Sequence, residues 1–438
     1  MLPPMRSGVF SRLGGVGVVG FLTYVGEYAA FIVVLAFLSD ELTYKFNLGV
    51  FGFALVAAIS GPYLVISGII AVPIGHLSDK YGRRRLTVIS CVIGAIALLS
   101  LIVADQVTNL TAFLVFMVIC LTGLIFAHGT YTATTLAYTG DHAGSQSMGK
   151  GFGFVEGAEF AGYAFGPALG TTVSFIAGRN GTFTLTAFMF LAAAFLTYIF
   201  MKEQRNSPRV VNQEGKTTDE HASHEEGHDD LSNETHSHSV TWGEFVSAFK
   251  LPIISVVLLH GFVAAIGFSV FFYWVPLYAN SLRNIIPVFE LLYGYFASIM
   301  ALTAVLLMIP FGHMLDAGRR RMPFLVIGLV LAGVLLASIF LTPSVPIYVF
   351  ASIAFGVSIA MIRVAQLVIL AEKSKPANRA AIMGTNHAVQ HAGYGVASLI
   401  AGYLVALGGF AFTFRYIAIV LLLAGATFLI YSKMRKLE

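Results

Sequence analysis

Long apolar blocks, separated by short polar segments, organise this chain of 438 residues. A helix that crosses a membrane needs about 20 apolar residues, and about twelve blocks reach that length. The pattern therefore predicts an all-α integral membrane protein with twelve transmembrane helices. The blocks cover approximately 14–38, 51–77, 86–104, 110–137, 150–177, 182–201, 251–276, 291–311, 323–342, 345–371, 381–406 and 410–432.

One polar stretch, residues 203–247, interrupts the apolar blocks. It is acidic and rich in His, and a segment of this composition cannot bury enough apolar surface to fold alone. We therefore expect an N-terminal six-helix bundle over 1–202, a cytoplasmic linker over 203–247 and a C-terminal six-helix bundle over 248–438. A solvated linker explains this composition, and weak binding of a divalent metal by its His and acidic residues is the alternative.

Composition supports lipid as the solvent of this chain. Its hydrophobic fraction is 57% and its charged fraction 11%, whereas a soluble domain carries about 25% charged residues. The net charge of +4 is not a nucleic-acid signature, because Lys and Arg gather in alternate short loops beside the apolar blocks. This asymmetry predicts an even number of spans in the cell (cytoplasmic or inner) membrane, with both termini cytoplasmic.

The two cysteines, Cys91 and Cys120, fall inside apolar blocks. They indicate neither a disulfide framework nor a thiolate metal site. The first block is too long for the apolar region of a cleaved signal peptide. We expect a monomer without a cofactor.

A basic motif occurs once in each half of the chain, between the second and third blocks and between the eighth and ninth. The two copies occupy matching places in their halves, so the chain contains an internal repeat. The second copy lacks one residue between Asp and Gly. A plain basic loop that only sets membrane orientation is the alternative interpretation, and the duplication disfavours it. The motif residues are Gly75, Asp79, Gly82 and Arg83 in the first copy, and Gly312, Asp316 and Arg319 in the second.

This Gly-x-x-x-Asp-x-x-Gly-Arg-Arg motif resembles the loop between the second and third helices of the major facilitator superfamily of secondary transporters. The resemblance extends over essentially the whole chain. It implies two pseudo-symmetric six-helix halves, a central cavity and alternating access. It also implies that Asp79 and the following Arg cluster stabilise one conformational state. The expected partners are a small-molecule substrate, protons and membrane lipid.

A second resemblance lies in the fifth block. Gly162, Gly166, Pro167 and Gly170 resemble the fifth-helix motif of the superfamily's proton-coupled drug antiporters. Small residues four apart let helices approach closely, so a packing seam without a role in substrate binding explains the same residues.

Ionisable side chains inside membrane spans cost about 2.5–3.5 kcal/mol each on insertion scales, and few blocks contain one. Glu27, His128, His260 and Arg363 lie in the first, fourth, seventh and tenth blocks. In the superfamily that the chain resembles, the corresponding helices line the central cavity. Glu27 is the leading candidate for a proton carrier, with a structural Glu as the alternative. Arg363 keeps its charge and must face the cavity, an anionic substrate or a carboxylate such as Glu27.

The fifth and eleventh blocks carry a further polar set. A constant shift along the chain, which we call the repeat shift, aligns Gly162-Tyr163 with Gly393-Tyr394. Under this shift, acidic residues of the first half align with imidazole and amide residues of the second half. These groups either form a second proton relay or join helices. They are Glu156, Glu159, His387, Gln390 and His391. Aromatic residues of the expected cavity helices, Tyr24 among them, either stack on a ligand or serve packing.

The leading functional hypothesis is proton-driven export of small amphipathic or cationic compounds, with Glu27, Glu156 and Glu159 coupling the protons. One alternative is proton-linked uptake of a small organic anion or sugar, which Arg363 favours. Two others are export of divalent metal fed by the His-rich linker, and a sensor that keeps the fold without transport. No catalytic triad or nucleotide-binding loop supports an enzyme.

Overall fold

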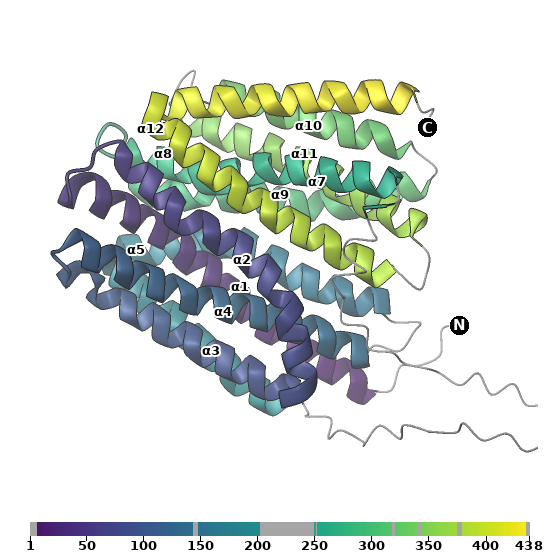
Figure 1. Cartoon of the computed structure of the whole chain (residues 1–438), viewed down its shortest axis with the longest axis horizontal. Helices are drawn as coiled ribbons and strands as arrows, with labels where there is room; N and C mark the ends of the chain where they lie inside the picture. The colour runs from purple at the N-terminus through teal and green to yellow at the C-terminus, as the bar shows by residue number, and fades with distance from the viewer. Residues whose placement is uncertain are drawn as a thin grey trace, which may run out of the picture.

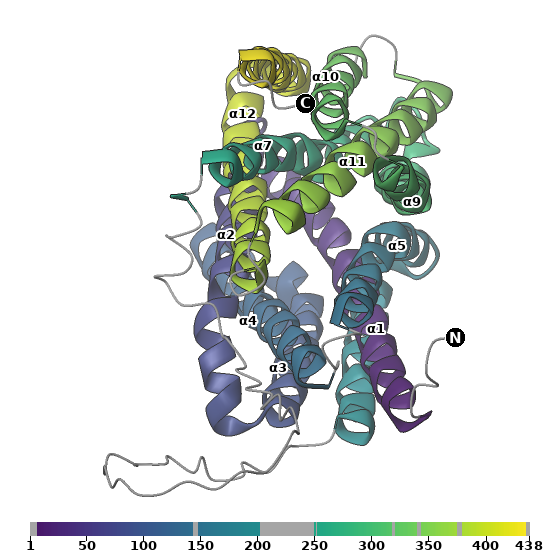
Figure 2. The same cartoon turned by 90° about the vertical axis from the view of Figure 1, so that its right-hand side faces the viewer.

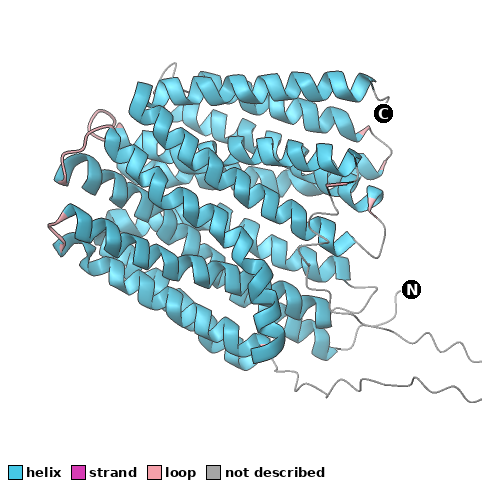
Figure 3. Cartoon of the chain, in the orientation of Figure 1, coloured by secondary structure: helices cyan, strands magenta, loops and turns pink. Residues whose placement is uncertain are grey.

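The computed structural model describes residues 7–142, 148–201, 249–250, 252–317, 320–339, 343–374 and 379–434. Within these ranges the chain forms helices and no strands (Figure 3), which confirms the predicted fold class. The linker 203–247 and Arg319 lie outside the described residues, as do the side chains of Asp79, Glu156 and Asp316. Gly75 is described only as part of its helix.

Five long helices form the first part of the chain, and a short π-helix and a short 3-10 helix extend two of them. They are α1 (Ser7–Asp40), the π-helix Glu41–Lys45, α2 (Phe51–Tyr81), α3 (Arg83–Ser100), the 3-10 helix Leu101–Gln106, α4 (Leu110–His142) and α5 (Met148–Phe200).

The second part repeats this arrangement. It consists of α7 (Pro252–Ser269), the π-helix Val270–Trp274, α8 (Val275–Ser281), α9 (Phe289–Asp316), α10 (Arg321–Ser338), α11 (Val345–Lys373) and α12 (Arg379–Met434).

Ten of the described helices are long and apolar enough to cross a membrane. Two of them, α5 and α12, contain one glycine outside the helical conformation, Gly178 with φ 69° and Gly409 with φ 77°. Positive φ is readily accessible only to Gly, so each glycine divides its helix into two consecutive spans. Ten helices with two such divisions are consistent with twelve spans. The divisions fall between the predicted blocks 150–177 and 182–201, and between 381–406 and 410–432.

The helices lie side by side in one bundle (Figure 1). We call the end where α1 begins and α12 finishes the terminal end, and the opposite one the far end. Figure 2 looks onto the terminal end, with α1, α3, α4 and α5 in the lower part and α10, α11 and α12 in the upper part. The chain thus builds two groups of helices that face each other: the first group consists of α1 to α5 and the second of α7 to α12.

Within the first group, α5 packs closely along α1 through the glycines of the fifth-helix motif. A Cβ atom at Gly162 would lie 2.6 Å from Cβ of Tyr24, and one at Gly170 would lie closer still to the carbonyl oxygen of Ala29. Such distances are far below van der Waals contact, so no side chain fits there. The motif therefore serves as a packing seam.

Two helix pairs join the groups. Along α2 and α12, Oγ of Ser60 lies 3.0 Å from Oγ of Ser398. Between α5 and α9, the N–H of Ala168 donates to Oγ of Ser298 at 2.9 Å. Ala168 follows Pro167, whose ring disturbs the regular helix ladder.

Ion pairs join elements at the far end. Nη1 of Arg283, after α8, donates to Oδ1 of Asp40 in α1 at 3.0 Å. Arg179, in the second span of α5, lies 3.5 Å from Glu41. The pair of Arg283 with Asp40, together with the two helix pairs, holds the groups together over the part of the bundle remote from the terminal end.

Large apolar side chains cover much of the exterior of the bundle. Ile176 is 77% exposed and Ile309 is 70% exposed. Apolar surface of this extent is unfavourable in water and suits a lipid environment. Further exposed apolar residues lie on both groups, among them Ile119, Phe188, Leu306, Phe350 and Leu423.

The two basic motifs lie at the terminal end, between α2 and α3 and between α9 and α10. Gly82, between α2 and α3, has φ 92°, and the guanidinium of Arg84 lies 3.8 Å from the centroid of the Tyr198 ring. In the second copy, Nη2 of Arg321 donates to Oε1 of Glu372 at the end of α11 at 2.5 Å. The basic residues thus tie each turn to a neighbouring helix of its own group. The state-stabilising role of Asp79 stays a prediction.

The seam between α1 and α5 predicts that the same substitution affects stability differently at two glycines. Gly170→Ala should destabilise the protein by roughly 1–3 kcal/mol, because the new methyl group overpacks the seam. Gly157→Ala is the matched control, since an added Cβ there meets nothing within 4 Å, and it should stabilise α5 or leave it unchanged. Thermal unfolding in detergent, followed by Trp fluorescence, measures both. Equal shifts at the two positions would contradict the seam.

The contact between α2 and α12 predicts a cross-link between the groups. A disulfide brings its sulfurs to about 2.05 Å, so Ser60→Cys with Ser398→Cys should oxidise after only a small movement. With a protease site placed in the linker, the cut fragments should migrate together on a gel until they are reduced. Ser60→Cys alone is the control. Fragments of the double variant that separate without reduction would show that the two helices do not meet in this way.

Candidate functional site

Glu27 lies near the middle of α1 and is only 4% exposed. The hydroxyl of Tyr63, in α2, donates to its Oε1. Nδ1 of His128, in α4, lies 2.7 Å from its Oε2. Three helices of the first group therefore meet at one carboxyl group. This group is buried from water and is hydrogen-bonded to an imidazole. The partner of Glu27 is not Arg363, the pairing that the sequence left open.

A second polar cluster joins α5 to α12. Oε2 of Glu159 lies 4.0 Å from Nε2 of His387, and the rings of His387 and His391 have centroids 4.4 Å apart. Tyr163, one turn after Glu159, donates its hydroxyl to Oε1 at 3.3 Å. Glu159 of one group and the imidazoles of the other therefore meet in space, whereas the repeat shift aligned Glu159 with Gln390. Glu156 belongs to α5, but its side chain lies outside the described residues.

His391 connects the two clusters. Its ring centroid lies 5.7 Å from that of His128, and Oγ of Ser67, in α2, lies 3.3 Å from its Nδ1. A series of imidazoles thus extends from Glu27 to Glu159 and crosses between the groups of helices.

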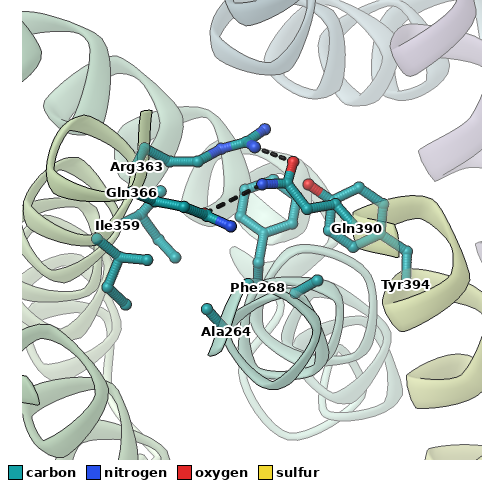
Figure 4. Close-up of a pocket in the computed structure, with 10 residues that line it drawn as sticks. Ala264, Phe268, Ile359, Arg363, Gln366, Gln390 and Tyr394 are labelled. Atoms are coloured by element: carbon teal, nitrogen blue, oxygen red, sulfur yellow. Dashed lines mark hydrogen bonds between the residues drawn. The ribbon is translucent and has the colours of Figure 1, made fainter. Parts of the chain in front are cut away.

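Arg363 belongs to an amide network in the second group (Figure 4). Its guanidinium donates to Oε1 of Gln390, whose Nε2 donates to Oε1 of Gln366 at 3.2 Å. Gln366 in turn donates to Oδ1 of Asn386 at 2.6 Å. The guanidinium also lies 5.4 Å from the ring centroid of Phe160 in α5. The network fixes a positive charge beside the contact between the groups.

A small cavity adjoins this network. Arg363, Gln366, Gln390, Phe268 and Tyr394 line it, with a volume of about 20 Å³. A cavity of that size holds about one water molecule. Its lining residues all belong to α7, α11 and α12, so a substrate larger than water requires this cavity to widen.

Tyr24 and His260 occupy different places. The Tyr24 hydroxyl lies 3.1 Å from Oγ1 of Thr132, and its ring meets that of His128 edge-on at 6.0 Å, so it borders the Glu27 cluster. Nε2 of His260 lies 3.1 Å from the carbonyl oxygen of Leu325 in α10, and its ring packs against Phe428. His260 is held inside the second group, and the structure does not bring it together with the other candidates.

The sequence analysis did not single out several polar residues of these clusters. Tyr63 and Ser67 lie in a predicted span, and Gln366 follows Arg363 by three residues, the spacing of one helix face. That spacing was a usable signal for Gln366. Nothing in the sequence distinguished Tyr63 from the tyrosines that serve packing.

The Major Facilitator Superfamily model matches residues 16–285 and 288–437. The chain belongs to this superfamily. The family suggested by the loop motifs is therefore confirmed, and the protein is a multi-pass membrane transporter.

Solved structures of other superfamily transporters have the same fold. A bacterial homolog of the human lysosomal transporter Spinster, in an inward-facing and unoccupied conformation, aligns with a TM-score of 0.70 and 13% identity over 97% of each chain. The nucleoside transporter NupG aligns with a TM-score of 0.66 and 14% identity over 94% of this chain and 98% of NupG.

A POT family transporter in complex with 5-aminolevulinic acid aligns with a TM-score of 0.65 and 14% identity over 96% of each chain. At these identities the likeness shows the fold alone. A comparison with curated protein sequences gave no match.

The bond between Glu27 and His128 predicts non-additive effects on stability. Glu27→Leu and His128→Leu should each destabilise the protein, because each leaves the other polar group buried without its partner. The double variant should lose less than the sum, by roughly 0.5–3 kcal/mol. Thermal unfolding of the four proteins measures this difference. A parallel cycle of Glu27→Leu with His260→Leu is the control, and there the effects should add; additivity in both cycles would refute the bond.

Proposed function

We propose that this chain is a proton-coupled secondary transporter in which Glu27 carries the proton. The observation that supports this most directly is the buried carboxyl group of Glu27, shared between Tyr63 and His128. An ionisable group at this depth is costly, and in membrane proteins such groups mark substrate and proton pathways.

The proposed proton step uses the surroundings of Glu27. In one state its carboxylate accepts from Tyr63 and from the Nδ1–H of His128. His128 lies beside His391 of the other group. Movement of the groups against each other therefore changes the electrostatic field at the bond between Glu27 and His128. In the alternate state the carboxyl group binds a proton from the side then open and releases it on return. Glu159 and Glu156 are the proposed secondary proton sites.

The charge of the cavity favours a small organic anion as the substrate. The guanidinium of Arg363 and the amides of Gln366 and Gln390 line the cavity. Guanidinium binds carboxylate through two parallel hydrogen bonds. Proton-linked uptake of such an anion would let the proton compensate the substrate's charge.

A second candidate is the export of small amphipathic or cationic compounds, and an aromatic cluster favours it. Tyr28 of α1 stacks on Tyr163 of α5 with centroids 4.1 Å apart. Phe272 of the second group meets the Tyr163 ring edge-on at 5.1 Å. Aromatic faces attract cations, and this cluster lies where the two groups meet.

The terminal end carries the basic motifs. By the positive-inside rule, we propose that this end faces the cytoplasm and that the protein lies in the cell membrane. The far end, held by Asp40 with Arg283, then faces the exterior and is the closed side in this conformation. We further propose that the protein works as a monomer.

The test measures proton movement in sealed inside-out vesicles with an acidified lumen and a lumenal pH dye. Probes are tetraphenylphosphonium as a lipophilic cation, succinate as a small organic anion, and glucose as a sugar. Anion or sugar symport should deepen the acidification, whereas cation antiport should drain lumenal protons. Glu27→Gln should reduce either response by roughly tenfold or more, because the carrier no longer binds and releases protons.

Glu290→Gln is the control, since Glu290 is an exposed carboxylate near the far end. It should respond like the unchanged protein. Arg363→Gln should abolish a response to succinate and spare a response to the cation. A Glu27→Gln protein that moves protons normally would reject Glu27 as the carrier, and no response to any probe would count against proton coupling for these substrate classes.

A further inference from the structure

We propose that Glu159, His387 and His391 form a binding site for a divalent transition-metal ion such as Zn²⁺, built from both groups of helices. The site shares Glu159 with the proposed secondary proton sites but does not involve Glu27, the proposed proton carrier. It also differs from the metal binding that the sequence suggested for the linker, because it lies between α5 and α12.

The ligand atoms are already close. Each residue offers one donor atom, and the three donors lie within 4.8 Å of one another. Around a tetrahedral Zn²⁺ with bonds of about 2.1 Å, donors are roughly 3.4 Å apart. Oε2 of Glu159 and Nε2 of His387 are 4.0 Å apart. Side-chain movements of about an ångström would therefore complete the geometry without a change in the backbone.

Hydrogen bonds around the ligands orient them as a metal site requires. Tyr163 donates to Oε1 of Glu159 at 3.3 Å, while Oε2 faces His387. Ser67 lies 3.3 Å from Nδ1 of His391, which leaves Nε2 of that ring for an ion. Metal-binding His residues commonly have their other nitrogen held in this manner, and such contacts fix the ring and its tautomer.

His387 is the most accessible of the three ligands. Glu159 and His391 are 6% and 4% exposed, but the side chain of His387 is 22% exposed. The three ligands leave a fourth position for water or a further donor, as in open zinc sites.

The ligand chemistry selects the class of ion. Two imidazoles and one carboxylate suit Zn²⁺, Ni²⁺ and Co²⁺ better than Mg²⁺ or Ca²⁺, which prefer oxygen donors. A site made only for an ion pair between Glu159 and His387 would not need His391 at contact distance from His387.

Because its ligands come from both groups of helices, the site links metal binding to the arrangement of the groups. Glu159 belongs to the first group and both His residues to the second, so the complete ligand set exists only when the groups meet as they do here. A bound ion would therefore favour this arrangement over one in which α5 and α12 have separated at this level.

The experiment is equilibrium dialysis of the purified full-length protein in detergent against Zn²⁺. The background variant carries Asn in place of the linker residues His221, His224, His228, His236 and His238. It should bind about one Zn²⁺ per chain, and His391→Asn or His387→Asn should weaken binding tenfold or more. Ser67→Ala, which spares all three ligands, should weaken it by roughly 10–100-fold.

His260→Asn is the matched control, because His260 is another buried His of the second group. It should bind Zn²⁺ like the background variant. Glu27→Gln should also bind normally, so the site can fail while proton coupling stands, and the reverse. Zn²⁺ binding that is absent from the background variant, or unchanged by His387→Asn and His391→Asn, would overturn the proposal. Thermal unfolding without metal verifies that each variant is folded.

Discussion

The close approach of α1 and α5 is the contact on which the polar clusters depend. Gly162, Gly166 and Gly170 bring the backbone of α5 against Tyr24, Tyr28 and Ala29, a distance that only small residues permit. Glu27 lies within that stretch of α1, and Glu159 lies one turn before the seam on α5. Without the glycines, α5 would move outward and carry Glu159 and Tyr163 with it. The seam thus links a packing requirement to the placement of two buried acids.

The second constraint is the joint between the groups. It combines close backbone contact along α2 and α12, hydroxyl contacts such as Ser60 with Ser398, and the ion pair of Asp40 with Arg283. None of these is a large interaction alone, since a hydrogen bond contributes only about 0.5–1.5 kcal/mol net. A joint made of many weak contacts can open without a prohibitive barrier. This property suits a superfamily whose members work by alternating access.

The sequence predicted the spans well because their signal is simple. Apolar blocks of sufficient length located each helix, and the divisions at Gly178 and Gly409 fell in the predicted gaps. It predicted the contacts less well. Glu27 and His128 were both singled out, but their bond was not, and His260 was grouped with them although it packs inside the second group. Helices that are apolar on all faces carry no pattern that fixes their rotation, so the sequence could not determine which side chains meet.

The repeat shift did align Glu159 with Gln390, and the structure brings these segments together around His387 and His391. Tyr63 and Ser67 were missed, because a single hydroxyl in an apolar span has many ordinary uses.

The two dividing glycines have a consequence for how the chain tolerates changes in length. Gly178 and Gly409 are related by the same repeat shift that aligns Gly162 with Gly393, so the halves have kept their spacing throughout these helix pairs. Because a single residue connects the two spans, an added residue there would rotate the following helix. Gly82 and Gly318, which belong to the two copies of the basic motif, are related by a larger shift, so the halves differ in length between that motif and the following segments. Insertions such as tags or labels should therefore be sought between α3 and α4 or between α10 and α11, not at the glycine turns.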